Sequence, residues 1–283
     1  SMSSTTAKVL TVSVLAVVSL PACSSKDGGS PSAVNAPASV ATSSGAPAAG
    51  SASAAGSAAA SSVQSAGTPT PSAVVGNVAS DTKNYTNATL AKALSGQKLG
   101  DVQAQTLSEG QLTEALKGIN ATAEIMKVAT VKPAACKTAT LANVDVIAKD
   151  SARAIAGADA LPSVVMVRSE SSPAAAVAAD KAWDAANSAC ANYEATMSKK
   201  GQTSKVTSVS TLTPVNLSVA RNGDGFSTSV TVNGKPAKQT AVTGTYGNVV
   251  IQAISPDGTD TPARLGVMVD DVARALAADM AQK

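Results

Sequence analysis

The sequence predicts an α+β fold for residues 80–283, with an antiparallel sheet, helices packed on one side of it, and a disordered tether before it. The fold class follows from amphipathic helical patterns and from a run of short β-branched segments separated by turn residues. The tether is predicted because residues 24–79 hold no aromatic residue and only two charged ones, Lys26 and Asp27. Such a segment cannot bury enough apolar surface to offset its ordering entropy.

The first elements of the domain are short. A capping box at residues 108–111 predicts a helix that ends near Gly118. Residues 123–136 predict a strand that is broken by Pro133. Residues 163–171 are apolar on both faces, which predicts a strand inside the sheet.

The clearest helical pattern runs over residues 173–198. Its apolar residues recur at spacings of three and four and form one stripe: Ala176, Ala179, Trp183, Ala186, Cys190, Tyr193 and Met197. The stripe predicts one long helix that packs on the core. The alternatives are a coiled-coil seam or the wall of a ligand site.

Residues 203–254 change to a period of two. The segments SKVTSVSTL, VNLSVA, FSTSVTV, AVTGTY and NVVIQAI are predicted strands. Asn233-Gly234 is a strong hairpin signal, and residues 222–225 (NGDG) are interpreted as another turn. These spacings predict an antiparallel meander. A Pro-Asp-Gly turn ends it, and Pro262 begins a final amphipathic helix.

The beginning of the chain predicts export and lipidation. An apolar run at residues 9–20 follows Lys8, which is the order of a secretory signal peptide over residues 1–22. The Leu-Pro-Ala-Cys that follows resembles the lipobox of bacterial lipoproteins, whose cysteine receives a diacylglycerol thioether and whose new amino terminus takes an acyl chain such as palmitate. The resemblance implies that residues 23–79 are a tether lipidated at Cys23, on the extracytoplasmic face of the cell membrane. The alternative is an ordinary cleaved signal peptide that leaves an unpaired thiol.

The other two cysteines of the chain are Cys136 and Cys190. In an extracytoplasmic protein, such a pair favours a disulfide over a metal site. A bridge that closes a loop of about 55 residues is worth on the order of 4 kcal/mol in the chain-entropy model. The alternative is two unrelated buried thiols.

Composition argues against several classes of function. Lys8, Lys26 and Asp27 are the charged residues before position 80, which leaves 20 basic and 18 acidic residues, a net charge of +2, in the domain. That balance and the scarcity of aromatic residues argue against a nucleic-acid partner. The chain has no histidine, which removes the usual catalytic triads and zinc sites. We therefore predict no catalytic residue, no cofactor and no metal site.

Paired carboxylates are the remaining catalytic possibility. Asp270 and Asp271 are adjacent on the predicted last helix, where neighbouring side chains diverge by about 100°. Glu109 and Glu114 lie on the first helix. Each of the four is predicted to be a solvated surface charge. The segment NGDGF at residues 222–226 lacks a Walker lysine or an EF-hand spacing, so it carries no predicted site.

Several of these segments together resemble a known family. The strand VVMVRSES, the helix in which Trp183 precedes Cys190 by seven residues, the segment GTYGNVVIQAI and the closing helix PARLGVMVDDVARALAADM are similar to the extracellular sensor domain of the mycobacterial kinase PknH and its stand-alone lipoprotein relatives. The resemblance covers roughly residues 105–280. It implies an α+β domain with a cleft for a ligand and with disulfides that hold the helices. Members with four cysteines have a second bridge that this chain lacks.

The predicted function is therefore that of a lipid-anchored cell-envelope lipoprotein. Its domain is expected to be a non-catalytic, sensor-like module that binds a small envelope ligand or a protein partner. The alternative is a carrier of apolar envelope lipids, which would need a large apolar cavity between helices and sheet. An enzyme is disfavoured, because no catalytic constellation can be assembled from these residues.

Overall fold

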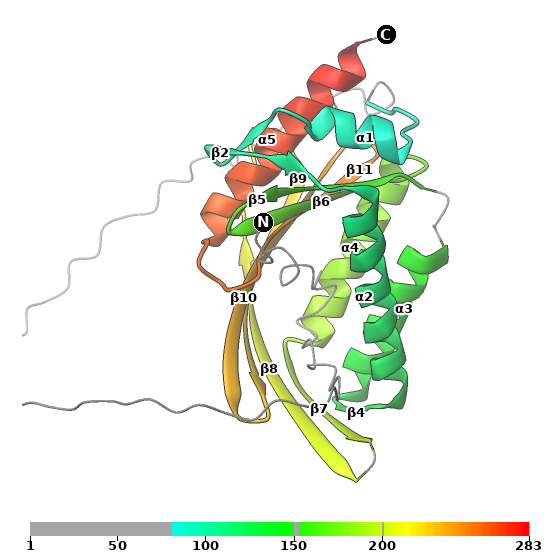
Figure 1. Cartoon of the computed structure of the whole chain (residues 1–283), viewed down its shortest axis with the longest axis vertical. Coiled ribbons are helices and arrows are strands. Elements are labelled where there is room, and N and C mark those ends of the chain that lie inside the picture. The colour runs from blue at the N-terminus through cyan, green and yellow to red at the C-terminus, as the bar shows by residue number, and fades with distance from the viewer. Residues whose placement is uncertain (1–80, 150–152, 200, 283) are drawn as a thin grey trace, which may run out of the picture. The chain divides into compact units, whose positions relative to one another are not determined.

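The structure, a computed structural model, describes residues 81–149, 153–199 and 201–282. The predicted signal peptide (1–22), Cys23 and the predicted tether (24–79) lie outside these residues. Within the described part, nine strands form one antiparallel sheet in the order β3-β5-β6-β11-β10-β9-β8-β7-β4 (Figure 1). The predicted α+β class with an antiparallel sheet is confirmed. The strands are β3 (Gln105–Thr106), β4 (Thr130–Lys132), β5 (Ile155–Ala160), β6 (Ser163–Ser169), β7 (Asn192–Lys199), β8 (Gln202–Pro214), β9 (Arg221–Val232), β10 (Lys235–Tyr246) and β11 (Val249–Ser255).

Helices cover both faces of this sheet, whereas the sequence predicted helices on one side. On one face, Val242 and Ile251 share a core with α5, and on the other face Ala241 and Ile254 pack with Trp183 of α4. Successive residues of a strand point to opposite faces of the sheet. Apolar residues occupy both odd and even positions of β10 and β11, so both faces must be covered by other elements. The helices are α1 (Asn87–Leu94) and α5 (Pro262–Ala281) on the first face, and α2 (Glu109–Val128), α3 (Ala134–Lys149) and α4 (Pro173–Ala189) on the second (Figure 1).

The helix α2 is longer than predicted. Its capping box at Ser108 and Gln111 is present, but the helix continues through Gly118 to Val128. The predicted strand at 123–136 is therefore wrong except for the three residues of β4. The reason is packing: the buried residues continue at helical spacing, at Leu112, Ala115, Ala123 and Met126.

The helix α4 ends earlier than predicted. It stops at Ala189, Cys190 caps it, and the chain turns into β7, where Tyr193 pairs with Ser208 of β8. The sulfur atoms of Cys136 and Cys190 lie 2.07 Å apart, so the predicted bridge is present and joins α3 to the end of α4. The apolar pattern requires Tyr193 to be buried, and it is buried beside this bridge. It lies on the strand β7, however, and not on the predicted helix. The spacing of the stripe alone does not distinguish the two conformations.

The meander of β8 to β11 is confirmed, with two local corrections. The turn at Asn233-Gly234 is present, but the segment NGDGF lies inside β9. The predicted strand at residues 215–220 is instead a loop between β8 and β9, and we call it the 215–220 loop. This loop packs closely against Gly244 of β10. A Cβ atom at that position would lie only 2.7 Å from Cδ1 of Leu217, so a larger residue would clash with the loop. A two-stranded sheet of β1 (Lys98–Leu99) and β2 (Val102–Gln103) precedes β3.

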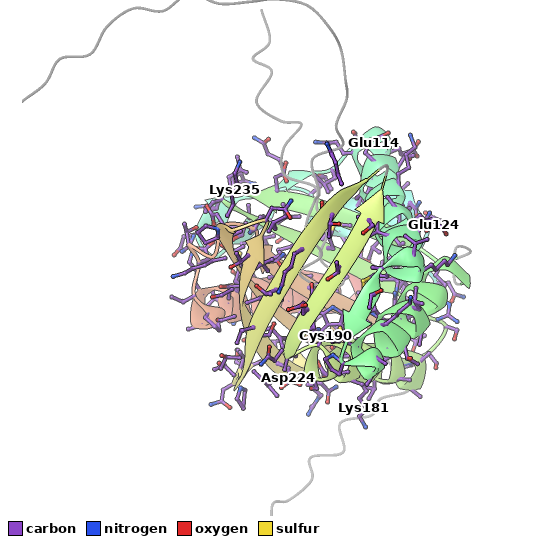
Figure 2. The ribbon with its side chains drawn as sticks, turned by 90° about the horizontal axis from the view of Figure 1, so that it is seen from below. Glu114, Glu124, Lys181, Cys190, Asp224 and Lys235 are labelled. Atoms are coloured by element: carbon purple, nitrogen blue, oxygen red, sulfur yellow. A yellow bond between two sulfur atoms is a disulfide. The ribbon has the colours of Figure 1, made fainter. Side chains whose placement is uncertain are left out.

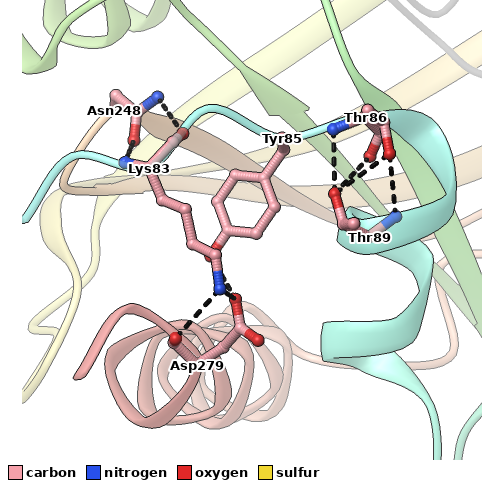
Figure 3. A network of polar contacts seen from close by, with 6 residues as sticks. All are labelled: Lys83, Tyr85, Thr86, Thr89, Asn248 and Asp279. Atoms are coloured by element: carbon pink, nitrogen blue, oxygen red, sulfur yellow. Dashed lines mark hydrogen bonds and ion pairs between the residues drawn. The ribbon is translucent and has the colours of Figure 1, made fainter. Parts of the chain in front are cut away.

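The start of the described chain is bound to its end (Figure 3). Lys83 Nζ and the Tyr85 hydroxyl both donate to Oδ2 of Asp279 near the end of α5, each at 2.8 Å. The backbone of Lys83 exchanges two hydrogen bonds with the side chain of Asn248, which lies in the turn between β10 and β11. These contacts fix residues 83–85 to the first face of the sheet. None of the helices in the described part is long and apolar enough to cross a membrane.

Candidate ligand-binding site

Asp270 and Asp271 were predicted to be solvated surface charges, and this is wrong for both. Asp270 is 6% exposed, and its carboxylate accepts hydrogen bonds of 2.7–2.9 Å from the backbone N–H groups of Ser218, Val219 and Ala220 and from the Ser218 hydroxyl. Asp271 accepts a bond from the Gly100 N–H at 2.9 Å. The two side chains do diverge as predicted. Their partners lie far away in the sequence, so the local pattern could not reveal them.

The other predicted positions divide between structure and surface. Glu109 and Glu114 are exposed on α2, as predicted, and Glu114 pairs with Lys117. Cys136 and Cys190 are buried in a core with Tyr193, so their bridge is part of the packed interior. Within the described part of the chain, no group of three or more His, Cys, Asp or Glu side chains is arranged to hold a metal ion.

A cluster of carboxyl groups lies between α4 and the sheet, and we call it the α4 carboxyl cluster. It consists of Asp180 and Asp184 of α4 and Asp224 of β9. The first two are four residues apart, which places them on one face of the helix. Asp224 stands opposite Thr243 of β10 in the strand register, so both side chains point to the face that α4 covers. Figure 2 shows Asp224 at the same edge of the view as Lys181, an exposed residue of α4.

Asp180 differs from the other buried acidic residues of the described chain. Glu170 is ion-paired with Arg153 and Arg168, Asp260 with Arg264, and Asp270 is bonded to the 215–220 loop. Asp180 is 1% exposed, and neither of its oxygens has a hydrogen-bond partner. Leaving a buried charged group without a partner costs more than the 1–3 kcal/mol of a neutral one. Such a group in a folded protein therefore needs an explanation.

Other polar atoms at this interface also lack partners. They are Oγ1 of Thr243, Nε1 of Trp183 and Oδ1 of Asp184. Thr243 is 1% exposed and Trp183 is 8% exposed, whereas Asp184 and Asp224 are half-buried. The Trp183 ring meets Phe226 edge-to-face at 4.8 Å, so the polar atoms adjoin an aromatic pair. The half-buried carboxyls mark the side from which solvent reaches the cluster.

Burial and mutual repulsion raise the pKa values of Asp180 and Asp184, so that these carboxyl groups ionise less readily. Burial raises the pKa of Asp180 to about 6, and the charge of Asp224 adds to the increase. The Thr243 hydroxyl faces Asp180 and lowers the pKa, although the two groups do not meet in a hydrogen bond of normal geometry. Burial also raises the pKa of Asp184, and the charge of Asp180 and a side-chain contact with Asp224 raise it further. Two carboxylates within hydrogen-bonding reach repel unless a proton or a cation lies between them. The cluster can therefore hold a proton or attract a positive group.

Replacing Asp184 with asparagine should stabilise the domain at alkaline pH. The folded-state pKa of Asp184 lies above its unfolded value of 3.8, so its contribution to stability is present below that value and is lost as the pH rises through the folded pKa. The variant should melt about 3 °C above the native chain at pH 9, after allowance for solvent screening, and at the same temperature at pH 3, below the unfolded pKa. The described charges that act on Asp184 are Asp180 and Asp224.

The measurement is thermal unfolding by circular dichroism across this pH range. The matched control is Glu114→Gln, which removes an exposed carboxylate on the outer side of α2 (Figure 2) and should melt at the native temperature at both pH 3 and pH 9. An Asp184→Asn variant that melts at or below the native temperature at pH 9 would contradict the repulsion described above.

The sequence interpretation missed all three members of this cluster. Asp180 and Asp184 could have been recognised from their spacing of four residues, one on either side of Trp183, on the apolar face of the helix. The sequence did predict a helix there. Asp224 could not have been found, because its segment was interpreted as a turn. No family model matches this sequence, and no curated protein matches it either.

Proposed function

We propose that the chain is a cell-envelope lipoprotein, anchored by acyl chains on Cys23, whose domain at residues 80–283 is a non-catalytic, sensor-like module that binds a ligand at the α4 carboxyl cluster. The observation that supports binding is the set of buried polar atoms without partners on Asp180, Trp183 and Thr243. A ligand that supplied those partners would relieve their desolvation cost. The resemblance to PknH-like sensor domains points in the same direction.

The binding function is tested by thermal unfolding of the full chain in the presence of a panel of small polar envelope molecules. A ligand at 100 times its Kd adds about 2.7 kcal/mol to the free energy of unfolding. We expect at least one molecule to raise the melting temperature of the native chain and to lose that effect in Thr243→Val, which removes the unpaired hydroxyl. Thr138→Val on the exposed side of α3 is the matched control. A panel without any such molecule would count against the proposal.

The anchor is a separate part of the proposal. In a Cys23→Ala variant no thioether can form, so the chain should appear in the growth medium and leave the membrane fraction. The physical reason is that two or three acyl chains, at about 0.8 kcal/mol per buried methylene, supply enough free energy to hold a protein on a bilayer. Ser24→Ala is the control and should stay with the membrane. Retention in the membrane fraction of a Cys23→Ala chain that has lost residues 1–22 would exclude the lipid anchor.

The alternative carrier function requires apolar surface for an envelope lipid. Carboxyl groups under α4 count against an apolar ligand there, because burying them beside hydrocarbon costs several kcal/mol. Native mass spectrometry of the chain isolated from its membrane separates the two ideas. An additional mass that matches an apolar lipid would favour the carrier, and a small polar mass would favour the binding module.

A further inference from the structure

We propose that the α4 carboxyl cluster binds the ammonium group of a small amine that also carries a hydroxyl group. This inference deepens the binding function proposed above and rests on it. The residues that carry it are Asp180, Asp184, Asp224, Trp183 and Thr243.

The charge of the cluster selects a cation. The charged groups that act on Asp180 and Asp184 are carboxyls, and the neighbouring Lys181 lies on the exposed side of α4. A buried carboxylate without a basic partner is stabilised most by a positive group that also donates hydrogen bonds. An ammonium group has three donors and no acceptor, so it can serve three carboxyl groups at once.

The arrangement of the oxygens favours an organic cation over a metal ion. Calcium and magnesium require several oxygen atoms at about 2.0–2.6 Å from one point. The described carboxyl groups do not form such a group. An ammonium group is bound by one or two charge-assisted hydrogen bonds of about 2.7–2.9 Å and does not need a full shell of oxygens around one point. An amine therefore needs less convergence of these carboxyl groups than a metal ion does.

The hydroxyl group is inferred from the remaining unpaired atoms. Trp183 lies three residues after Asp180 on the same face of α4, and its Nε1–H has no acceptor. The hydroxyl of Thr243 faces Asp180 without a hydrogen bond of normal geometry, and it can donate or accept. A ligand oxygen next to the amine would satisfy one or both. The aromatic ring of Trp183 adds favourable contact with a cation.

The size of the ligand is limited by burial. Asp180 and Thr243 are each 1% exposed, so the bound group must be small and enclosed. Asp184 and Asp224 are half-buried, so they are the members of the cluster that solvent contacts. An amino alcohol fits these limits as a free molecule. In a lipid headgroup its hydroxyl is esterified to phosphate, and the remaining oxygen can still accept a hydrogen bond from the Trp183 Nε1–H.

The test is isothermal titration of the full chain carrying Cys23→Ala, at pH 7.5, with ethanolamine and with ethylene glycol as the neutral analogue. We expect saturable binding of ethanolamine alone. The affinity should fall at least tenfold in Asp180→Asn and in Asp184→Asn, and should be unchanged in Glu114→Gln. Circular dichroism reports whether each variant is folded, and Asp224→Asn replaces either one that is not.

Two further arms distinguish the source of the amine. Vesicles that contain phosphatidylethanolamine are compared with vesicles of phosphatidylcholine, and sedimentation of the protein with the former alone, in competition with free ethanolamine, would assign the site to a headgroup. Binding of free ethanolamine without such sedimentation would assign it to a free amine.

The proposal is overturned if ethylene glycol binds as well as ethanolamine, or if Asp180→Asn and Asp184→Asn bind ethanolamine as the native chain does. If ethanolamine fails while another molecule of the panel stabilises the chain in a Thr243-dependent way, the amine is wrong and the binding function stands. If no molecule binds, both fail.

Discussion

Loss of the disulfide between Cys136 and Cys190 should lower the free energy of unfolding of the domain by about 4 kcal/mol. The two cysteines are 54 residues apart in the sequence, and their bridge closes a long loop in the unfolded chain. In the chain-entropy model, this closure removes conformations from the unfolded state. In the folded state the bridge ties α3 to the end of α4, beside the core that contains Tyr193.

The measurement is urea unfolding of the native chain with and without reductant, and of a Cys136→Ala, Cys190→Ala double variant. Alanine is chosen because both positions are at most 2% exposed, where serine would add a buried hydroxyl. The single variant Cys23→Ala is the control, and its unfolding should not change. If reduction leaves the unfolding midpoint of the native chain unchanged, the bridge does not stabilise the fold.

Replacing Asp270 with alanine should lower the free energy of unfolding by about 3 kcal/mol. The carboxylate is the hydrogen-bond acceptor for the N–H groups of Ser218, Val219 and Ala220, and its removal leaves these donors without their partner. The 215–220 loop would then lose the contact that holds it against α5. The effect should exceed that of Asp271→Ala, the adjacent control, whose carboxylate serves Gly100 and the exposed Arg274.

The role of Asp270 also predicts a pH dependence. Burial alone would raise its pKa, but the backbone donors and the Ser218 hydroxyl outweigh burial and hold the pKa below its usual range. Its contribution is therefore fully present above the unfolded value of 3.8 and is lost as the pH falls through the folded pKa. Urea unfolding at pH 7 and pH 3 should show a large difference between native chain and Asp270→Ala at pH 7 and a smaller one at pH 3. Equal differences at both values would contradict this account.

Much of the secondary structure could be predicted because its signals are local. The capping box at Ser108, the Asn233-Gly234 hairpin and the start of the last helix at Pro262 each depend on neighbouring residues. The errors occurred where a local pattern fits two structures. The stripe that runs through Cys190 to Tyr193 has helical spacing, yet the backbone changes to a strand there because β8 offers hydrogen-bond partners.

The candidate site could be predicted only in part. The spacing of Asp180 and Asp184 was visible, but a pair of aspartates on a helix is usually a solvated feature. What changes their chemistry is the approach of Asp224 and Thr243, which are 40 or more residues away in the sequence and are brought together by the register of β9 and β10.

The sequence by itself determined the α+β class, the order of most elements and the pairing of the two domain cysteines, because these depend on residue type and on the period of the apolar residues. Only the tertiary structure decided that helices cover both faces of the sheet, that Asp270 holds the 215–220 loop, and that three aspartates meet under α4. The physical reason is that each of these depends on which strand lies beside which and in what register. Burial then determines whether a carboxyl group is a surface charge, a hydrogen-bond acceptor for the backbone or a place for a cation.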